Sequence, residues 1–299
     1  MPELPEVETI KQELNQLIVN KKIKSVEINL AKQVKCLPAR FLKLVPGTKV
    51  KEVRRRAKVL IVSLNNGYYL VFHLKMTGQL IYRQHSSVPT SSGHLPSKRV
   101  GYYYAGGGHP IKHDLEDLPN KYSHVIFNFS DGSRLFFNDL RQFGWVKLLN
   151  EKELEKLEKE FGPEPLSINF SEFKKLFKNK KSVIKPLLMN PKFIAGVGNI
   201  YAQEALFCAG ISPLRKAGTL KEMELEKLFE CLKKILKLAI KMKGTSAENY
   251  VDAFGREGSM ENYLKVYNRA GQACKRCKNK LKSVKQGSRA TAYCKNCQK

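Results

Sequence analysis

The apolar residues at the start of the chain recur at helical spacing, and those that follow recur at strand spacing. Val7, Ile10 and Leu14 lie three or four positions apart, which predicts an amphipathic helix at the N-terminus. Between residues 23 and 82 the apolar residues alternate or run in short blocks such as IKSVEINL, KVLIVSL and YYLVFHL. The letters NNG at residues 65–67 are a turn signal typical of β-hairpins. The pattern predicts a helix followed by antiparallel strands.

A long break separates two groups of predicted strands, and helices follow the second group. Residues 83–123 are rich in Ser, Pro and Gly and follow neither period, so we expect an insertion that is either functional or mobile. Strand-like blocks then resume as HVIFNF and RLFFND, joined by an Asp-Gly turn. From Glu151 the spacing becomes helical, and its clearest stripe spans residues 222–243. This order predicts an α+β, multidomain chain whose strand-rich part precedes a helical part.

Charge is the feature of the composition that says most about a partner. The 299 residues include 54 Lys and Arg against 27 Asp and Glu, a net charge of +27. An excess of this size, spread along the chain, indicates a polyanionic partner. The alternative is a cationic surface that serves solubility alone. With 42% apolar residues the chain can bury a real core, and its length suggests two domains.

The sequence predicts a soluble, cytoplasmic protein without a membrane anchor. It contains no run of about 18 apolar residues and no apolar signal region at its start. Its seven cysteines are an odd number, and four of them cluster near the C-terminus, which does not suggest a secreted disulfide framework. We expect Cys36, Cys208 and Cys231 to be plain buried or free thiols.

Four cysteines have the spacing of a metal site. Two residues separate Cys274 from Cys277, two separate Cys294 from Cys297, and sixteen residues lie between the pairs. This spacing is typical of two knuckles that together hold one tetrahedral zinc ion. Because four thiolates fill the coordination sphere, the zinc is predicted to be structural rather than catalytic.

The segment around these cysteines is strongly basic. Residues 261–299 hold eleven Lys or Arg and one acidic residue, so the predicted finger can contact phosphates. Arg289 lies between the two cysteine pairs, where a hairpin could place it against a nucleic-acid backbone. The alternative for Arg289 is an ordinary solvated surface charge.

The N-terminal stretch MPELPEVET carries candidate nucleophilic chemistry. Removal of Met1, which is usual when a small residue follows, would make Pro2 a secondary amine at the chain end. An α-amino group has a pKa of about 8, roughly two units below that of Lys, so more of it is unprotonated at neutral pH. Glu3 and Glu6 lie one helical turn apart beside it and could move protons. The alternative is a plain helix start with Pro5 in the first turn.

Three further stretches carry candidate binding residues. The glycine-bounded turn at 196–198 leads into Asn199 at the mouth of a helix, which suits a phosphate, although tight packing explains such glycines almost as well. Lys58 and His73 fall on adjacent predicted strands, where a purely structural histidine is the alternative. The stretch NDLRQFGW at 138–145 follows a strand and places an Arg two residues before a Phe at a loop tip. Such pairs can wedge into a stack of bases.

Together these stretches resemble the formamidopyrimidine-DNA glycosylase family, which also contains endonuclease VIII. The resemblance covers essentially the whole chain. PELPEVE, RRRAK, HLKMTG, the D-x-R-x-F-G turn, AGVGNIYAQEALF and the four-cysteine finger with RATAYC occur in the family order. An endonuclease VIII more typically opens with Pro-Glu-Gly-Pro-Glu, so the start ELPEVE favours the first branch.

The resemblance implies three parts and an activity. Residues 1–150 would form a catalytic β-sandwich flanked by helices, residues 151–265 a helix–two-turn–helix DNA-binding domain, and residues 266–299 a four-cysteine zinc finger. Double-stranded DNA would lie in the cleft between the two halves. The implied activity is base-excision repair, in which oxidised purines such as 8-oxoguanine and formamidopyrimidines are removed and the abasic site is cleaved by β- and δ-elimination. We expect a monomer with one structural zinc ion.

The resemblance also implies roles for single residues. Pro2 would attack C1′ of the damaged nucleoside and form a Schiff base, Glu3 would handle protons at the sugar ring, and Glu6 would help to hold the extruded lesion. The resemblance also implies four phosphate ligands near the lesion: Lys58, His73, Asn199 and Arg289. Of these, Lys58 also belongs to the catalytic group. A further set would fill the gap left by the flipped nucleotide and probe the opposite base: Met76, Arg141 and Phe143.

The chain departs from the family pattern in four places. The usual Lys-His-Asp-His stretch reads KYSH at 121–124, so Tyr122 stands where a phosphate-contacting histidine is usual. The D-x-R-x-F-G turn has lost its usual Pro and second Arg. The segment after Gly244 corresponds to the loop that caps an oxidised purine and is atypical beyond Thr245, and residues 83–120 exceed the usual connection. Lesion preference is the implication that these departures affect most.

Two alternatives stay open at this point. The same active site could serve an endonuclease VIII-like glycosylase for oxidised pyrimidines, and excision rates on the two lesion classes would separate these enzymes. A non-catalytic zinc-finger DNA-binding protein is the other alternative, since charge and zinc say nothing about chemistry. A free amine on Pro2 distinguishes the enzyme from the binding protein.

Overall fold

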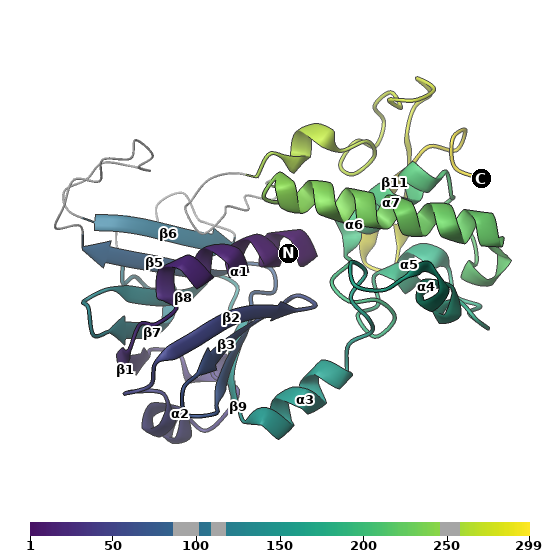
Figure 1. The fold of residues 1–299 in the computed structure, drawn as a ribbon. Coiled ribbons are helices and arrows are strands. Elements are labelled where there is room, and N and C mark those ends of the chain that lie inside the picture. The colour runs from purple at the N-terminus through teal and green to yellow at the C-terminus, as the bar shows by residue number, and fades with distance from the viewer. Residues whose placement is uncertain (86–101, 109–117, 246–257) are drawn as a thin grey trace. The chain divides into compact units, whose positions relative to one another are not determined.

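The chain forms two compact units. The computed structural model describes residues 1–85, 102–108, 118–245 and 258–299 (Figure 1). The first unit comprises Met1–Glu158 with Met242–Ser259, and the second comprises Lys159–Lys241 with Met260–Lys299. Most of the insertion predicted within 83–120, and most of the atypical segment after Gly244, lie outside the described residues. The domain boundaries predicted at residues 150 and 265 stay predictions.

Two antiparallel sheets make up the strand-rich part of the first unit (Figure 1). The five-stranded sheet has the order β1-β7-β8-β5-β6, and its strands are β1 (Ile23–Ile28), β7 (Ser123–Phe129), β8 (Arg134–Asp139), β5 (Gly78–His85) and β6 (Tyr102–Gly108). The four-stranded sheet has the order β2-β3-β4-β9, and its strands are β2 (Val50–Arg56), β3 (Val59–Leu64), β4 (Tyr69–His73) and β9 (Trp145–Leu149). The predicted β-sandwich is confirmed.

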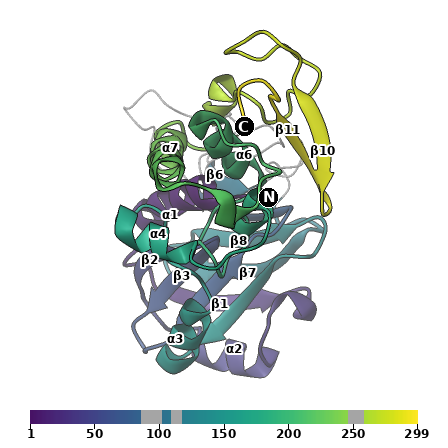
Figure 2. The same cartoon turned by 90° about the vertical axis from the view of Figure 1, so that its right-hand side faces the viewer.

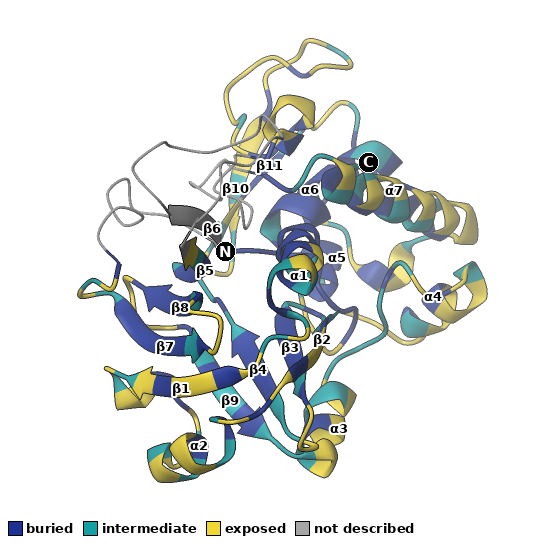
Figure 3. Ribbon diagram, turned by 60° about the vertical axis from the view of Figure 1, so that its left-hand side comes forward, coloured by how far each residue is buried: buried dark blue, intermediate teal, exposed yellow. Residues whose placement is uncertain are grey.

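One apolar core joins the two sheets. In strands such as β3, β5, β7 and β8, alternate residues contribute to this core, as the period of two requires. Figure 3 draws all buried residues dark blue. Phe72 of β4 stands between Phe127 of β7 and Phe137 of β8, with ring centroids 5.9 Å apart in both pairs. All three rings are at most 1% exposed, so the sheets are fixed to each other through aromatic contacts.

Helix α1 (Leu4–Ile18) is fastened to the edge of the four-stranded sheet. Its apolar stripe joins the core of the sandwich, and Pro5 stands in its first turn, where a missing N–H costs nothing. The side chain of Asn15 accepts a hydrogen bond from the N–H of Val53 at 3.0 Å and donates to the carbonyl of the same residue. This two-way pairing with β2 holds the helix, and therefore its N-terminal end, in one place.

The turns between strands follow the sequence signals, with one correction. Gly67 and Gly132 have φ angles of 80° and 84° in the β3–β4 and β7–β8 turns, the left-handed conformation that glycine adopts without strain. Lys58 was predicted to lie on a strand but occupies the β2–β3 turn, after Ala57 at φ 53°. The short helices of this unit are α2 (Pro38–Leu44), α3 (Glu151–Lys159) and a 3₁₀ turn at Ala31–Gln33.

The second unit is helical and ends in a hairpin (Figure 2). Helix α6 (Asn199–Ala209) is buried along nearly its whole length and packs against α7 (Glu222–Lys241), which confirms the stripe predicted there. None of the helices in the described residues is long and apolar enough to cross a membrane. The remaining elements are α4 (Phe170–Leu176), α5 (Ile184–Leu188), 3₁₀ turns at Ala217–Thr219 and Met260–Tyr263, and the strands β10 (Lys282–Gln286) and β11 (Arg289–Tyr293).

Two cysteines predicted to be thiols are paired. Cys208 of α6 and Cys231 of α7 form a disulfide with their Cα atoms 5.8 Å apart. The two helices pack side by side, so residues that are 23 positions apart in the sequence meet in space. Periodicity places each cysteine on its own helix but says nothing about which faces will meet. Cys36 is a half-buried thiol, as predicted.

Candidate active site and metal centre

Pro2, Glu3 and Glu6 lie together at the start of α1, and all three are buried. The exposed fractions of Glu3 and Glu6 are 3% and 2%. The N–H of Glu3 donates to Oε2 of Glu6 at 2.8 Å, and the Glu3 side chain accepts the N–H of Glu6, so this capping box holds the two glutamates together directly after Pro2. Met1 precedes Pro2 in the sequence, and its removal exposes the proline nitrogen as a secondary amine.

The second oxygen of Glu6 holds the segment that follows α7. Oε1 accepts a hydrogen bond from the N–H of Thr245 at 2.9 Å. Gly244 has φ +84°, and a Cβ at this position would lie 2.8 Å from the Glu6 carboxylate, so only glycine fits without displacement. Lys243 forms an ion pair with Glu13 at 3.2 Å, about two helical turns after Glu6 on α1. Glu6 therefore connects Pro2 and its neighbours to the stem of the segment after Gly244.

Arg55 fastens the turn that carries Lys58. Its Nη1 donates to the carbonyl of Ala57 at 2.8 Å, and its Nε donates to Glu8 on α1 at 2.9 Å. Burial would raise the pKa of Glu8, but the hydrogen bonds from Lys11 and Arg55 outweigh it and hold the pKa below its usual value. The charged pair thus ties the Lys58 turn to the helix that begins after Pro2.

His73 ends β4 next to this turn and is held as a neutral ring. Its Nδ1 accepts the N–H of Lys75 at 3.0 Å, so Nε2 carries the hydrogen and is the donor. Burial, together with the charges of Lys75 and Lys58, lowers the pKa of His73 to about 3. The ring also packs against Trp145, with centroids 5.6 Å apart. The structure therefore brings Lys58 and His73 together, as a cation beside a neutral donor.

Asp139 is the common anchor of two loops that carry candidate residues. Its carboxylate is fully buried and accepts the Thr77 hydroxyl from the β4–β5 loop. It also accepts the backbone N–H groups of Arg141, at 3.2 Å, and of Gly144, at 2.6 Å, from the β8–β9 loop. The Thr77 hydroxyl in turn accepts the Arg141 N–H at 3.0 Å. Met76 and the pair Arg141 and Phe143 are thus set on loops that share one buried carboxylate.

The tips of these loops carry exposed side chains. Phe143 is 54% exposed, and the guanidinium of Arg141 lies over its ring at 4.9 Å. This exposure excludes a position for Phe143 in the core of the first unit. Met76 is half-buried in the neighbouring loop. An exposed aromatic ring on an anchored loop is a side chain that a partner can bury.

Tyr122 directly precedes β7, and its carbonyl accepts the N–H of Asp139 at 3.1 Å; His124 is the second residue of the strand. His124 is 4% exposed, and its Nε2 lies 2.7 Å from the carbonyl of Asp139, so this histidine is part of the interior. Tyr122 is half-buried, and the Lys121 ammonium lies 5.1 Å from the centre of its ring. The sequence departure therefore places a phenol beside a cation where the family usually has an imidazole.

In the second unit, a buried lysine orients Asn199 at the start of α6. Lys185 is 0% exposed, and its Nζ donates to Oδ1 of Asn199 at 2.6 Å and to the hydroxyl of Thr291 at 2.8 Å. Because Oδ1 accepts from Lys185, the Asn199 amide hydrogens are the groups that remain to donate elsewhere. Gly196, with φ +80°, makes the turn that leads into the helix.

Gln203 docks the terminal hairpin onto α6. Its Oε1 accepts the N–H of Ala292 at 2.7 Å, and its Nε2 donates to the carbonyl of Asn199 at 2.9 Å. Through Gln203 and Lys185, strand β11 is held against the first turn of α6. Arg289, half-buried at the start of β11, thereby belongs to the same rigid group as Asn199.

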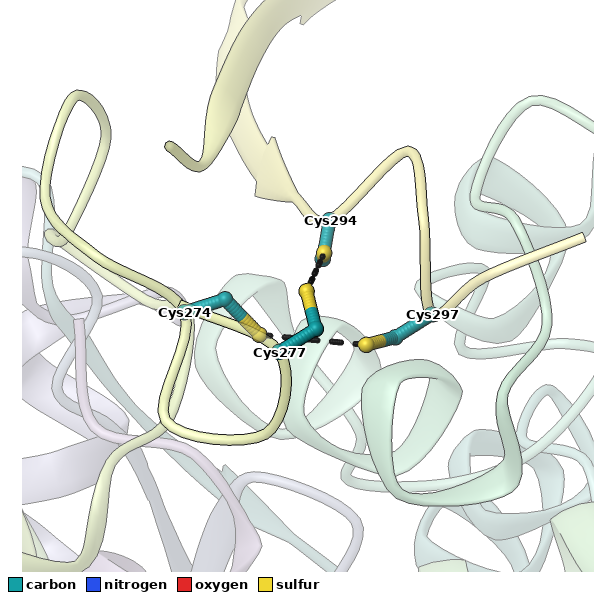
Figure 4. Close-up of side chains that lie close together, drawn as sticks. All are labelled: Cys274, Cys277, Cys294 and Cys297. Atoms are coloured by element: carbon teal, nitrogen blue, oxygen red, sulfur yellow. Dashed lines mark hydrogen bonds between the residues drawn. The ribbon is translucent and has the colours of Figure 1, made fainter. Parts of the chain in front are cut away.

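The four C-terminal cysteines converge (Figure 4). Their Sγ atoms all lie within 4.8 Å of one another. The Sγ atoms of Cys274 and Cys297 are 3.9 Å apart, and those of Cys277 and Cys294 are 3.4 Å apart. Zn–S bonds of about 2.3 Å in a tetrahedron place the sulfurs about 3.8 Å apart, so the donors fit one zinc ion.

The chemistry of these sulfurs also calls for a cation. Burial and the other three sulfurs raise the pKa of Cys297 to about 12, so four thiolates do not gather here unaided. A backbone N–H of Asn279 and the side chain of Asn296 lower the pKa of Cys277 to about 6, which supplies one thiolate at neutral pH. A bound zinc ion stabilises the remaining three as thiolates.

Sequence reasoning missed three residues that orient the predicted ones: Arg55, Asp139 and Lys185. A weak signal existed for each of them. Lys185 is a single cation in the apolar stretch VIKPLL, Asp139 is the last residue of the predicted strand RLFFND, and Arg55 stands in the run RRRAK. None of these patterns reveals the partner, because each partner is distant in the sequence.

Three family models match successive parts of this chain. The formamidopyrimidine-DNA glycosylase N-terminal domain matches residues 1–146, the formamidopyrimidine-DNA glycosylase H2TH domain matches residues 161–251, and the zinc finger found in FPG and IleRS matches residues 271–299. The third match covers all four converging cysteines, which hold one structural zinc ion.

Whole proteins match over their full length. The formamidopyrimidine-DNA glycosylase of Carboxydothermus hydrogenoformans is 40% identical over 100% of both chains, and that of Pelotomaculum thermopropionicum is 38% identical over 100% of this chain and 99% of the other. The structure is similar to a Lactococcus lactis FPG mutant in complex with Fapy-dG containing DNA, with a TM-score of 0.82, 30% identity and 99% of each chain covered. It is also similar to MutM in complex with carbocyclic 8-oxo-G containing DNA, with a TM-score of 0.81, 31% identity and the same coverage. This chain belongs to the formamidopyrimidine-DNA glycosylase family.

Proposed function

We propose that this chain is a bifunctional DNA glycosylase and AP lyase that removes oxidised purines from double-stranded DNA. The observation that carries the proposal is the burial of Pro2 together with Glu3 and Glu6 at the N-terminus of α1. The secondary amine is a nucleophile, and the two buried carboxylates can carry protons, so one helical turn contains both functions. Because its proposed substrate is chromosomal duplex DNA, the enzyme would act in the cytoplasm, at the nucleoid.

The chemistry begins with the Pro2 nitrogen. Its lone pair forms a bond to C1′ of the damaged nucleoside, and the bond from C1′ to the base breaks with the electron pair going to the base. The base takes up a proton as the positively charged nitrogen gives up its own, which restores the nitrogen lone pair. Glu3 delivers a proton to the sugar ring oxygen, the ring opens, and an iminium links Pro2 to C1′. Loss of a proton from C2′ then expels the 3′ phosphate, and a second elimination expels the 5′ phosphate. Water finally releases the amine and the sugar fragment.

Two groups of side chains support the choice of a duplex substrate. The cation Lys58, the neutral donor His73, the amide of Asn199 and the guanidinium of Arg289 are phosphate ligands in this proposal. Met76, Arg141 and Phe143 fill the gap left when the damaged nucleotide leaves the stack. Complexes of family members contain Fapy-dG, an 8-oxo-G analogue or an abasic site, which supports oxidised purines as the lesion class.

A borohydride trap tests the nucleophile. Protein that lacks Met1, as verified by mass spectrometry, is incubated with an 8-oxoguanine duplex and borohydride, which reduces the iminium. The expected product is a covalent protein–DNA adduct whose peptide map ends at Pro2.

The matched control is the same protein with an added residue before Pro2, which turns the amine into an amide. It should bind the duplex yet give neither adduct nor cleavage. An adduct that persists in this control and maps to Lys58 would show that the nucleophile is misassigned. Faster excision of oxidised pyrimidines than of 8-oxoguanine would instead favour an endonuclease VIII-like activity.

A further inference from the structure

The second unit contains a pocket that the proposed chemistry does not use. Its volume is about 460 Å³, which lies within the range of ligand sites. Ile235 and Leu238 of α7 form one wall, and Phe207 of α6 forms another. Met260 and Tyr263, from the 3₁₀ turn before the finger, complete the apolar lining. Tyr263 is 42% exposed, so the mouth presents an aromatic ring to solvent.

Four cations surround this apolar lining. Lys234 of α7, Lys265, and Lys275 and Arg276 of the first cysteine knuckle all line the pocket. The guanidinium of Arg276 is fixed, because it donates to the carbonyls of Phe207 at 2.8 Å and of Cys208 at 2.9 Å. Lys234 and Lys265 are exposed, with their ammonium groups at the surface. The pocket therefore combines an apolar interior with a cationic rim.

Among the described residues, one acidic side chain lines the pocket, and it cannot balance these charges for a ligand. Glu204 is 2% exposed, and its carboxylate accepts the backbone N–H groups of Lys265, Val266 and Tyr267 at 2.9 to 3.1 Å. The Glu204 carboxylate is therefore engaged in binding the backbone of residues 265–267, the segment that leads into the finger. The net field at the mouth stays positive, so an occupant with carboxylates is favoured.

The pocket residues Phe207 and Cys208 lie at the opposite end of α6 from Asn199, one of the predicted phosphate ligands of this unit. Asn199 is the first residue of the helix, whereas Phe207 and Cys208 are in its last turn. Nine residues of helix separate Asn199 from Cys208, which is about 13 Å along the axis. A ligand in the pocket therefore leaves the amide of Asn199 accessible.

We propose that this pocket binds an acidic peptide segment of a partner protein, with an apolar side chain inserted and its carboxylates on the cationic rim. Charge complementarity selects an acidic chain, and the apolar interior selects a peptide side chain over a paired duplex, whose aromatic bases are stacked inside and whose surface presents the charged backbone. The partner recognised in this way binds at the C-terminal end of α6.

Fluorescence anisotropy with a labelled Asp-Asp-Leu-Phe-Asp-Asp peptide tests the proposal on the full-length, zinc-loaded protein. The double variant Lys234→Glu with Lys265→Glu should weaken peptide binding at least about tenfold, because it reverses two rim charges. Tyr263→Ser should weaken it as well. The matched control is Lys227→Glu with Lys237→Glu, two exposed lysines of α7 that do not line the pocket, and it should retain the affinity within about twofold. Zinc content and melting temperature verify that each variant is folded.

Three outcomes overturn the proposal. Equal weakening by the two double variants would mean that the peptide senses only the net charge of the protein. Equal binding of a peptide with Leu and Phe replaced by Ser would mean that the apolar lining takes no part. Displacement of the peptide by a saturating lesion duplex, or by a single-stranded oligonucleotide of the same charge, would assign the pocket to nucleic acid. A peptide that stays bound to the protein–duplex complex supports the proposal.

Discussion

The carboxylate of Glu6 accepts the backbone N–H of Thr245 at 2.9 Å, across 239 positions of sequence. Its other oxygen accepts the N–H of Glu3, the residue next to the proposed nucleophile Pro2. One side chain therefore sets both the start of α1 and the stem of the segment after Gly244. In the proposed function, catalysis and lesion capture share this carboxylate.

Gly244→Ala should slow excision of 8-oxoguanine far more than cleavage of a ready-made abasic site. A Cβ at Gly244 would lie 2.8 Å from the Glu6 carboxylate and would displace Thr245, whereas an abasic substrate has no base to hold. Single-turnover rates on the two duplexes measure the difference. Gly132→Ala is the matched control, because Gly132 has the same φ of +84° but no atom within 4 Å of an added Cβ.

Both variants should lose about 1 kcal/mol of unfolding free energy from the strained backbone. Gly244→Ala should lose more than this, because its Cβ also meets the Glu6 side chain. Only Gly244→Ala should change the ratio of the two rates. If Gly132→Ala alters this ratio equally, contact with Glu6 is not the cause.

Phe143→Ala should slow excision from a fully stacked duplex much more than processing of an abasic site. The ring is 54% exposed, so its removal leaves the core intact and the melting temperature nearly unchanged. Flipping a nucleotide costs a few kcal/mol, and the vacated gap collapses unless side chains fill it. Arg141→Ala should in addition relax discrimination by the base opposite the lesion. A loss on both substrates with a melting temperature several degrees lower would contradict the wedge assignment.

The stability of the first unit should fall with acid through the His73 ring. Its pKa is about 3 in the folded chain and about 6.5 when unfolded, so between these values only the unfolded chain binds the proton. The contribution of the neutral His73 ring to the free energy of unfolding is complete above about pH 6.5. It is lost as the pH falls towards 3, by at most about 1.4 kcal/mol per pH unit. Chemical unfolding of wild type and His73→Gln over pH 4 to about 8 measures it. Parallel profiles for the two proteins would show that His73 is not the titrating group.

Cys277→Ala should reduce zinc content and DNA affinity more than it reduces the folding of residues 1–243. Metal-site folding is local, and the finger carries the predicted phosphate ligand Arg289. Atomic absorption should find one zinc per wild-type chain.

Arg289→Ala in the intact finger should lower the log–log salt slope of duplex binding by about 0.9, as expected for one lost phosphate contact. Lys237→Ala on α7 is the control, and equal slopes for the two variants would leave Arg289 as an ordinary surface charge.

Spacing and periodicity predicted the parts of this fold whose signals are local. The two Cys-x-x-Cys pairs, the turns at Gly67 and Gly132, and the stripe of α7 each depend on residues close together in the sequence. Local conformation is dictated by such neighbours, so these predictions hold in the structure.

The contacts that orient the site could not be predicted in this way. The disulfide between Cys208 and Cys231, the Glu6–Thr245 hydrogen bond and the Lys185–Thr291 hydrogen bond all join distant segments. Lys58 fell on a predicted strand because alternation continues through RRRAKVL, whereas the positive φ of Ala57 ends β2 just before it. Each of these features depends on which faces pack together, and a periodic pattern does not contain that information.

Lys185 provides a structural route by which zinc binding can be coupled to the amide of Asn199, because it bonds both Asn199 and the strand that leads to Cys294. The same ammonium donates to Asn199 and to Thr291, and Thr291 lies three residues before the zinc ligand Cys294. Loss of metal frees the strand that presents Thr291, and the lysine then loses one of the two acceptors that define its direction. In the proposed function, a phosphate held by Asn199 would by reciprocity raise the affinity of the four sulfurs for zinc. Occupied DNA sites would then protect the finger against chelation.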